Sequence, residues 1–267
     1  MGLITIDKKI CRRDGICREV CPYALFEADP EGYPVLQPGG AERCIACGHC
    51  VAICPHGALD HAGVPLAATI PVDPALAIPA SAGLQLLKGR RSIREFTATP
   101  VTRELAGTLI DTTRWAPTAT NRQPVRWLVV MDPVEVRRLA GFTVDWLRQE
   151  STRFPQYSIF VDAWDKGQDR VLRGAPHLAV TYAEEEWAWS AGDCAIALTY
   201  FELAAHAHGL GTCWAGILTR AAANSQALAE ALALPAGHKV FGAVMFGLPR
   251  YRYQRIPSRQ AAHVQWR

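Results

Sequence analysis

The spacing of apolar residues changes along the chain and separates stretches of helix from stretches of strand. Apolar positions three and four apart predict amphipathic helices over residues 103–115, 133–146 and 225–234. Short apolar runs, which are typical of buried strands, occupy residues 126–131, 177–182 and 240–246. Thr102 can cap the first of these helices, and Pro133 suits the first turn of the second. Residues 148–174 are polar and aromatic without a clear period, so they predict no element.

One further stretch, residues 192–208, is rich in alanine and apolar nearly all round a helical projection. A helix without a polar face is buried on every side, either in a core or between subunits. Helices and strands follow one another in irregular order. This pattern predicts an α+β fold in which helices pack on a sheet.

The first sixty residues contain no element of comparable length. A turn signal at residues 29–32 stands between short apolar pairs at 25–26 and 35–36, and predicts a small hairpin. Residues 63–84 are rich in alanine and proline without a periodic apolar face, which is typical of a semi-rigid linker. We therefore predict a small domain over residues 1–62 and a larger one over residues 85–267.

Composition and charge narrow the classes of function. Of the 267 residues, 49% are hydrophobic and 20% are charged, as in a globular protein that can bury a core. The formal net charge of +3 is too small to indicate binding to nucleic acid or to an anionic membrane. No apolar run approaches the roughly 18 residues of a membrane span, and residues 1–10 contain no secretory signal. We expect a cytoplasmic protein that binds neither nucleic acid nor membrane.

An internal repeat contains seven of the nine cysteines. Its second copy places cysteines at positions 44, 47, 50 and 54, directly before Pro55, which is the C-x2-C-x2-C-x3-C-P pattern of bacterial two-cluster ferredoxins. Its first copy has the same spacing at positions 11, 14, 17 and 21, with Asp14 in place of the second cysteine. Because disulfide frameworks belong to secreted proteins, these cysteines favour a metal site.

The spacing also predicts which residues share an iron–sulfur cluster. Three ligands two residues apart surround one cluster, and the fourth, three residues further on and before a proline, reaches the other cluster. The ligands of one 4Fe-4S cluster would be Cys11, Asp14, Cys17 and Cys54. The ligands of the other would be Cys21, Cys44, Cys47 and Cys50.

Two questions about these clusters stay open at the level of sequence. A carboxylate holds iron less firmly than a thiolate, so the Asp14 cluster is either an Asp-ligated four-iron centre, which we favour, or a three-iron centre. A structural zinc module also uses paired cysteines, although zinc sites rarely repeat this spacing.

Four segments of the larger domain resemble, in the same order, segments of the FMN-dependent nitroreductase family. They are an Arg-Arg-Ser-Ile-Arg opening at residues 90–94, a Pro- and Asn-containing element at 116–124, a Gly-Leu-Gly-Thr-Cys-Trp turn at 209–214, and a C-terminal basic element at 247–257. Each segment alone is a weak signal, but their order makes the set specific. The resemblance covers residues 85 to about 260, and it implies a nitroreductase-like mixed sheet with flanking helices behind a fused ferredoxin-like domain.

The resemblance implies which side chains hold the FMN phosphate. Arg90 and Arg255 match phosphate-binding positions, and guanidinium groups suit a phosphate dianion. Ser92 would add a hydroxyl donor, with Arg91 close by. Arg94 matches a cation near the pyrimidine end of the isoalloxazine ring, where a fixed positive charge raises the reduction potential.

The family binds each FMN in a dimer interface, so the resemblance also implies a homodimer. The residues expected from the partner subunit are Pro117, Thr118, Ala119 and Asn121. The backbone of Ala215 and Gly216 would face the flavin ring near N5. The family's usual aromatic residue after Gln-Pro is replaced by Val125, which leaves the acceptor specificity open.

These features together predict a redox enzyme. Electrons from an external donor, either a ferredoxin-type protein or NAD(P)H, would pass through the two clusters to FMN and on to a small acceptor such as a nitroaromatic or a quinone. No side chain is assigned a catalytic role. Two alternatives remain: a reductase specialised for one metabolite, with nitro reduction as a side activity, and a non-catalytic electron-relay or redox-sensing protein.

Overall fold

The computed structural model describes residues 2–267. Contacts along the chain divide these residues into two compact units. The first unit comprises residues up to 77 together with 120–122, and the second comprises residues 78–119 and 123–267. Each unit is described by itself below.

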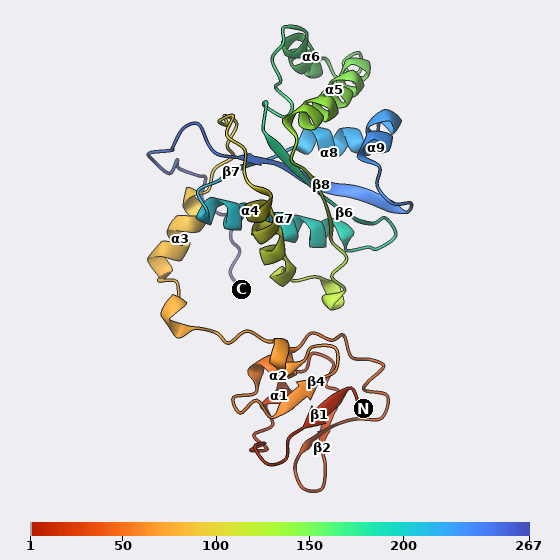
Figure 1. The fold of residues 1–267 in the computed structure, drawn as a ribbon, viewed down its shortest axis with the longest axis vertical. Helices are drawn as coiled ribbons and strands as arrows, with labels where there is room; N and C mark the ends of the chain where they lie inside the picture. The colour runs from red at the N-terminus through yellow and green to blue at the C-terminus, as the bar shows by residue number, and fades with distance from the viewer. Residues whose placement is uncertain (1) are drawn as a thin grey trace. The chain divides into compact units, whose positions relative to one another are not determined.

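The N-terminal unit is built from two short strand pairs and two short helices (Figure 1). Strand β1 (Ile4–Ile6) pairs antiparallel with β4 (Leu59–His61), and β2 (Phe26–Ala28) pairs antiparallel with β3 (Pro34–Leu36). The helices are α1 (Ile16–Glu19) and α2 (His49–Ile53). The β2–β3 pair is the hairpin that the turn signal at residues 29–32 predicts.

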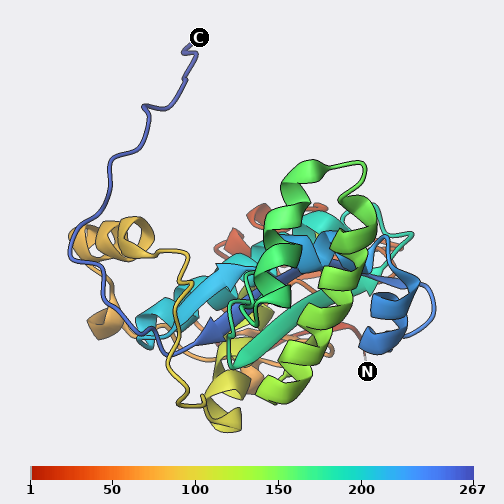
Figure 2. The ribbon, with the colours of Figure 1, turned by 90° about the horizontal axis from the view of Figure 1, so that it is seen from above.

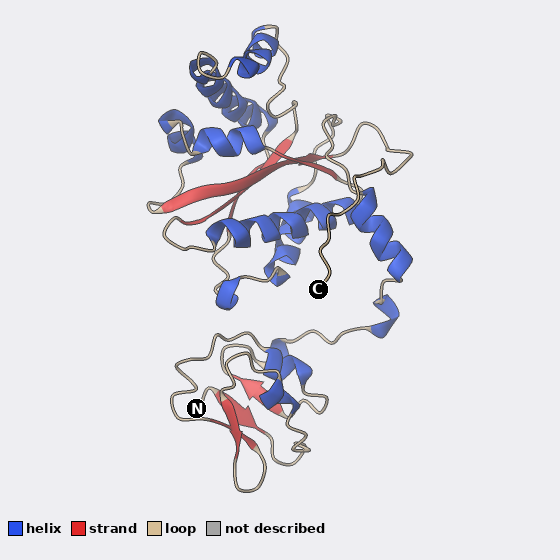
Figure 3. Cartoon of the chain, turned by 180° about the vertical axis from the view of Figure 1, so that it is seen from behind, coloured by secondary structure: helices blue, strands red, loops and turns tan. Residues whose placement is uncertain are grey.

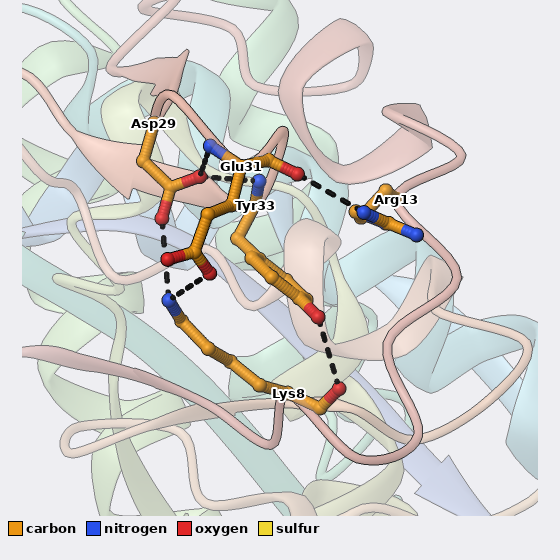
Figure 4. Close-up of polar contacts among 5 residues, drawn as sticks. All are labelled: Lys8, Arg13, Asp29, Glu31 and Tyr33. Atoms are coloured by element: carbon orange, nitrogen blue, oxygen red, sulfur yellow. Dashed lines mark hydrogen bonds and ion pairs between the residues drawn. The ribbon is translucent and has the colours of Figure 1, made fainter.

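A polar network fastens this hairpin to the segment that precedes it (Figure 4). Asp29 Oδ1 accepts hydrogen bonds from the backbone N–H groups of Glu31 and Tyr33, which closes the turn. Lys8 Nζ lies 3.0 Å from a Glu31 carboxylate oxygen, and the Tyr33 hydroxyl donates to the Lys8 carbonyl. Arg13 donates to the Glu31 carbonyl. The turn therefore anchors both ends of residues 8–13, a segment that contains one of the predicted cluster ligands.

The second unit is a four-stranded sheet with helices on both faces (Figures 1 and 3). The strand order is β5-β6-β8-β7, and neighbouring strands run antiparallel. The strands are β5 (Arg126–Val130), β6 (His177–Glu184), β7 (Gly211–Trp214) and β8 (His238–Gly247). A single parallel bridge joins Ser92 to Thr212 on β7, so the pairing is mixed.

Alternation along the strands explains the two helical layers. Leu178 and Val180 of β6 belong to a core cluster with one group of helices, whereas Ala179 belongs to a second cluster on the other face. Because both faces are apolar, both need a cover. The first face packs against α5 (Pro133–Glu150), α6 (Ser158–Asp165), α8 (Gly216–Ala222) and α9 (Gln226–Leu232). The second face packs against α4 (Arg103–Thr112) and α7 (Ser190–Ala207).

The predicted helices and strands of the larger domain are all present, with boundaries shifted by a few residues. The Thr102 hydroxyl accepts from Leu105 N at 3.2 Å, which is the N-cap expected for α4. The structure adds α6 within residues 148–174, where no element is predicted. At eight residues this helix is too short to display a clear period.

The predicted linker is more ordered than an extended spacer. It contains two single turns of 3-10 helix, Leu66–Ala68 and Pro74–Leu76, and the start of α3 (Ala80–Gly89). Other 3-10 turns lie at Thr113–Trp115, Ala119–Asn121 and Pro155–Tyr157. After β8 the chain continues to residue 267 without helix or strand (Figure 2). Within residues 2–267, no helix has the length and apolar character needed to cross a membrane.

Candidate functional site

Two cavities in the N-terminal unit are lined by the two predicted ligand sets. The first cavity is lined by Cys11, Asp14, Cys17 and Cys54. The second is lined by Cys21, Cys44, Cys47 and Cys50. The fourth cysteine of each repeat copy therefore reaches the cavity of the other copy. Among the described residues, no group of three or more His, Cys, Asp or Glu side chains is arranged to hold a single metal ion. The predicted ligands line the two cavities instead.

The thiols in each cavity are close enough to affect one another's ionisation. Burial raises the pKa of Cys17, and the nearby Cys54, Asp14 and Cys11 raise it further. Burial also raises the pKa of Cys50 to about 11, with an added rise from Cys47 and Cys44. Several thiolates crowded together are unfavourable unless a cation compensates their charge. The donor sets therefore fit iron–sulfur clusters, whose iron binds thiolates.

The backbone around the two cavities repeats with an offset of 33 residues. Positive φ angles at residues 13, 15 and 24 recur at residues 46, 48 and 57. The N–H of Leu25 donates to Cys21 Sγ at 3.4 Å, and the N–H of Ala58 donates to Cys54 Sγ at 3.3 Å. The two halves thus hold their fourth cysteines in the same way.

Two side chains break this symmetry. Asp14 Oδ1 accepts from Ile16 N at 3.2 Å, while its Oδ2 lies 3.9 Å from Nε2 of His56, which lines the same cavity. In the second cavity, the buried ring of His61 lies with Nε2 3.5 Å from Cys44 Sγ. Sequence analysis missed both histidines, because neither fits a ligand spacing.

In the second unit, the arginine-rich segment 90–94 lies along β7. Ile93 N donates to the Thr212 carbonyl at 2.8 Å, next to the bridge between Ser92 and Thr212. The approach is so close that a Cβ on Gly211 would lie 2.6 Å from Ile93 Cγ1. A glycine is therefore required at position 211, and the contact brings the basic segment beside the turn that leads into α8.

A buried carboxylate, Glu202 of α7, connects these two segments. It is 5% exposed, and its Oε1 lies 3.2 Å from Arg90 Nη1. The same carboxylate accepts from Thr212 Oγ1 at 3.0 Å and from Trp214 Nε1 at 2.7 Å. Glu202 is not among the predicted site residues, although an acidic residue in a mostly apolar helix signals a buried partner.

The other arginines predicted to bind FMN lie within the basic segment or beside the end of α3. Arg94 Nη1 donates to the Ser92 carbonyl at 3.4 Å. Arg91 is half-buried next to Arg90. Arg255 lines a separate cavity of the second unit, which is also lined by Gly89 at the end of α3. Burial raises the pKa of Cys213, and the positive charge of Arg94 opposes that rise. Cys213 is therefore a protonated core thiol rather than a reactive one.

The loop at residues 116–125 is held by a second buried carboxylate of α7. Asp193 Oδ1 accepts from Ala119 N at 2.9 Å, and its Oδ2 accepts from Trp187 Nε1 at 3.0 Å. Thr118, with Val125 and Trp127, lines a cavity of about 320 Å³, while Pro117 is exposed.

Asn121 differs from the other predicted flavin residues. It belongs to the N-terminal unit, where its Nδ2 donates to the carbonyls of Ile45 and Ala46 at 3.1 and 3.0 Å. These carbonyls lie between two residues of the second ligand set, so Asn121 supports that loop.

The turn after β7 leaves space in front of the backbone. Ala215 is buried, and its N–H donates to the Ala243 carbonyl at 2.8 Å. Gly216 begins α8, and a Cβ added there would meet nothing within 4 Å. The space in front of Gly216 is therefore open.

Comparison with known proteins identifies the class to which this architecture belongs. The nitroreductase family model matches residues 87–248, more than half of the chain, and the chain belongs to that family. The model of a 4Fe-4S dicluster domain matches residues 3–55, the part that contains both ligand sets. The protein is therefore a nitroreductase-family oxidoreductase with an N-terminal iron–sulfur domain.

Individual relatives agree with this classification. A protein from Archaeoglobus fulgidus, provisionally described as an NADH dehydrogenase/NAD(P)H nitroreductase, is 27% identical over 168 residues, which are 62% of this chain and 85% of the relative. A Desulfovibrio desulfuricans nitroreductase solved in complex with FMN is 27% identical, with a TM-score of 0.50 over 72% of this chain and 94% of that one. A Bacteroides fragilis nitroreductase with bound FMN is 20% identical and shares the fold, with a TM-score of 0.56 over 68% of this chain and 98% of that one.

Proposed function

We propose that this protein passes electrons from an external donor through two iron–sulfur clusters to FMN, and from FMN to a small acceptor such as a nitroaromatic or a quinone. One observation carries the proposal. A single chain combines two cavities, each lined by four cluster-type donors, with a basic segment held against β7. The fold around that turn is shared with nitroreductases solved with FMN.

The cysteines and Asp14 would hold the clusters, which supply one-electron chemistry when bound. Seven thiolates and one carboxylate provide eight donors, four to a cavity. Asp14 lines the first cavity, and its Oδ1 is engaged by the backbone N–H of Ile16, which leaves Oδ2 as the oxygen that would bind iron. We propose Asp14 as the fourth ligand of a four-iron centre.

The second unit would bind FMN, which links one-electron donors to two-electron acceptors. Arg90, Arg91 and Arg255 would receive its phosphate, with the Ser92 hydroxyl as a further donor. Glu202 fixes the direction of the Arg90 guanidinium, because the two groups are paired at 3.2 Å. Arg94 would place a positive charge near the ring, and Ala215 and Gly216 would border it.

The exposed face of α7 supports a homodimer. Ile196 and Tyr200, one turn apart, are 38% and 37% exposed. They lie on a face of α7 that also exposes Thr199, so this helix is not buried on every side within one chain, whereas its apolar sequence predicts burial on every side in a core or between subunits. A second copy would cover this apolar stripe. The partner subunit would then supply the loop at residues 117–121 to the flavin, as the family resemblance implies. We further propose a cytoplasmic location, where free thiols remain available for cluster assembly.

The first experiment is an anaerobic purification with iron, labile sulfide and released flavin measured per chain. The proposal predicts about eight irons and one FMN. Zinc without sulfide would overturn the cluster assignment, and full clusters without FMN would leave only an electron relay.

The electron path is tested with a variant that damages one cavity. Cys50→Ala should lose nitroaromatic and quinone reduction driven by a reduced ferredoxin-type donor, while reduction of the acceptor by chemically reduced FMN persists. Cys194→Ala is the matched control, since this thiol is buried within α7 and burial raises its pKa to about 12. Equal rates for wild type and Cys50→Ala with the protein donor would contradict the path. A broad acceptor screen in which one metabolite is strongly preferred would instead identify a specialised reductase.

A further inference from the structure

The histidine at the end of β4 has a contact that no ligand motif accounts for. The His61 side chain is 1% exposed, and its Nε2 lies 3.5 Å from Sγ of Cys44. We propose that His61 donates an N–H···S hydrogen bond to the Cys44 thiolate and thereby raises the reduction potential of the second cluster. This inference rests on the proposed cluster at Cys21, Cys44, Cys47 and Cys50.

The backbone around His61 determines which ring nitrogen carries the proton. Nδ1 accepts the N–H of Gly63 at 2.9 Å and the N–H of Val64 at 3.1 Å. A nitrogen that accepts from backbone donors carries no proton of its own, so the neutral ring is protonated at Nε2. Nε2–H is thus the group that points at Cys44 Sγ. The turn at residues 61–64 orients the ring before any cluster is bound.

The internal repeat supplies a natural control for this contact. The residue 33 positions before His61 is Ala28, and the residue 33 positions before Cys44 is Cys11. An alanine side chain has no donor, so the equivalent interaction is missing from the first copy. The backbone N–H···S bonds to Cys21 and Cys54 are matched between the cavities. His61 therefore adds one side-chain donor to the second cavity alone.

The direction of the effect follows from charge. Reduction adds an electron to the cluster, and much of that negative charge resides on the sulfurs. A donor placed against a ligand sulfur stabilises the reduced state more than the oxidised state, and hydrogen bonds to sulfur are among the factors that set cluster potentials. His61 would thus make the second cluster easier to reduce than it would be without this donor.

Two substitutions separate the donor from the structural role of the ring. Gln can place an amide N–H near the position of Nε2, whereas Asn can place its oxygen near Nδ1 and accept from Gly63 N in an Asx-type turn. His61→Gln therefore keeps the donor, and His61→Asn keeps the turn. His208→Asn is the control, since His208 is an exposed histidine that lines neither cluster cavity.

The measurement is an anaerobic redox titration of the full-length protein followed by electron paramagnetic resonance, after iron and sulfide analysis has shown that both clusters are present. His61→Asn should lower one of the two midpoint potentials. At a fixed potential, the ratio of reduced to oxidised cluster should then fall several-fold, and a tenfold fall corresponds to about 59 mV. His61→Gln and His208→Asn should stay close to wild type. Asp14→Cys should move the other midpoint, which belongs to the first cavity. The midpoint that His61→Asn moves is then assigned to the second cavity.

Several results would overturn the inference. These are equal shifts in His61→Asn and His61→Gln, no shift in either, loss of the second cluster in both, or a shift of the midpoint that Asp14→Cys moves. Failure of the cluster assignment itself would appear earlier, as missing iron and sulfide in the wild-type protein.

Discussion

The two units assemble their candidate sites in different ways. In the N-terminal unit, a repeated local motif places donors around two cavities, and the path of the backbone is duplicated at the same offset. In the second unit, Arg90 meets Glu202 across 112 positions of sequence, and both depend on β7 for their place. A local motif tolerates little change in its own residues, whereas a long-range network depends on the whole fold.

Within the N-terminal unit, the two copies of the repeat share their ligand spacing but differ in most other side chains, and two of these differences lie at or against a predicted ligand. The first copy has a carboxylate, Asp14, where the second has Cys47. The second copy has His61 against a ligand sulfur, where the first has Ala28. Duplication therefore preserved the cavity, and single side chains made the two cavities chemically different.

The largest expected effect comes from removing equivalent donors from the two copies. Cys47→Ala should lose about one iron per chain and leave a three-iron centre held by the three remaining thiolates. Asp14→Ala should lose less than that, because a carboxylate already holds the fourth iron of the first cluster less firmly than a thiolate does. Iron and sulfide analysis of anaerobically purified protein measures the difference. Equal losses in the two variants would contradict the proposed asymmetry.

The next effect tests the long-range network of the second unit. Glu202→Ala should weaken FMN binding about tenfold or more and lower the free energy of unfolding by about 1–3 kcal/mol, since it leaves Arg90 and Trp214 without their shared acceptor. Glu202→Gln should fall between wild type and Glu202→Ala. Fluorescence titration with FMN and urea unfolding measure the two quantities.

The control for this network is Glu230→Ala, which removes an exposed glutamate of α9. It should leave FMN affinity unchanged. If Glu202→Ala also binds FMN like wild type, Arg90 does not need Glu202 to receive the phosphate.

A smaller effect is expected when the two copies are made alike. Asp14→Cys restores the cysteine of the second copy, and thiolate holds iron more firmly than carboxylate. The first cluster should then lose its fourth iron several-fold more slowly in air. The rate at which the three-iron electron paramagnetic resonance signal appears measures this change. A rate that is the same as in wild type would indicate that the iron held by Asp14 is not the one that is lost most easily.

The smallest effect is a dependence of the second unit's stability on pH. Val101 N donates to Nε2 of His177, and Nδ1–H donates to the Met131 carbonyl, so the buried ring is neutral. Burial lowers the pKa of His177. The unfolded chain therefore binds a proton first, near pH 6.5, and stability should fall as the pH decreases below that value, at up to about 1.4 kcal/mol per pH unit.

Tryptophan fluorescence can follow this unfolding, because all eight tryptophans lie in the second unit. His177→Gln should flatten the dependence on pH below 6.5, relative to an unfolded-state pKa of about that value. His208→Gln, at an exposed position, should retain the wild-type slope. An unchanged slope in His177→Gln would assign the acid sensitivity to other groups.

The sequence by itself determined the elements and the local motifs of this protein. Periodicity located β5, β6, β8 and the longer helices. Each of them buries an apolar face and is long enough for the spacing of that face to repeat in the sequence. It did not locate α6, which is too short to show a period. The cysteine spacing predicted two donor sets, and those sets line the two cavities, since a ligand loop of a dozen residues is fixed by local geometry.

The tertiary structure alone decided which distant groups meet. Nothing near Arg90 in sequence indicates Glu202, and nothing near Cys44 indicates His61, because each pair forms only when a strand or helix is packed in register. The assignment of the proton on His61 likewise depends on the turn that follows β4. Local spacing encodes contacts within a loop, whereas contacts between elements arise from how their buried faces pack together.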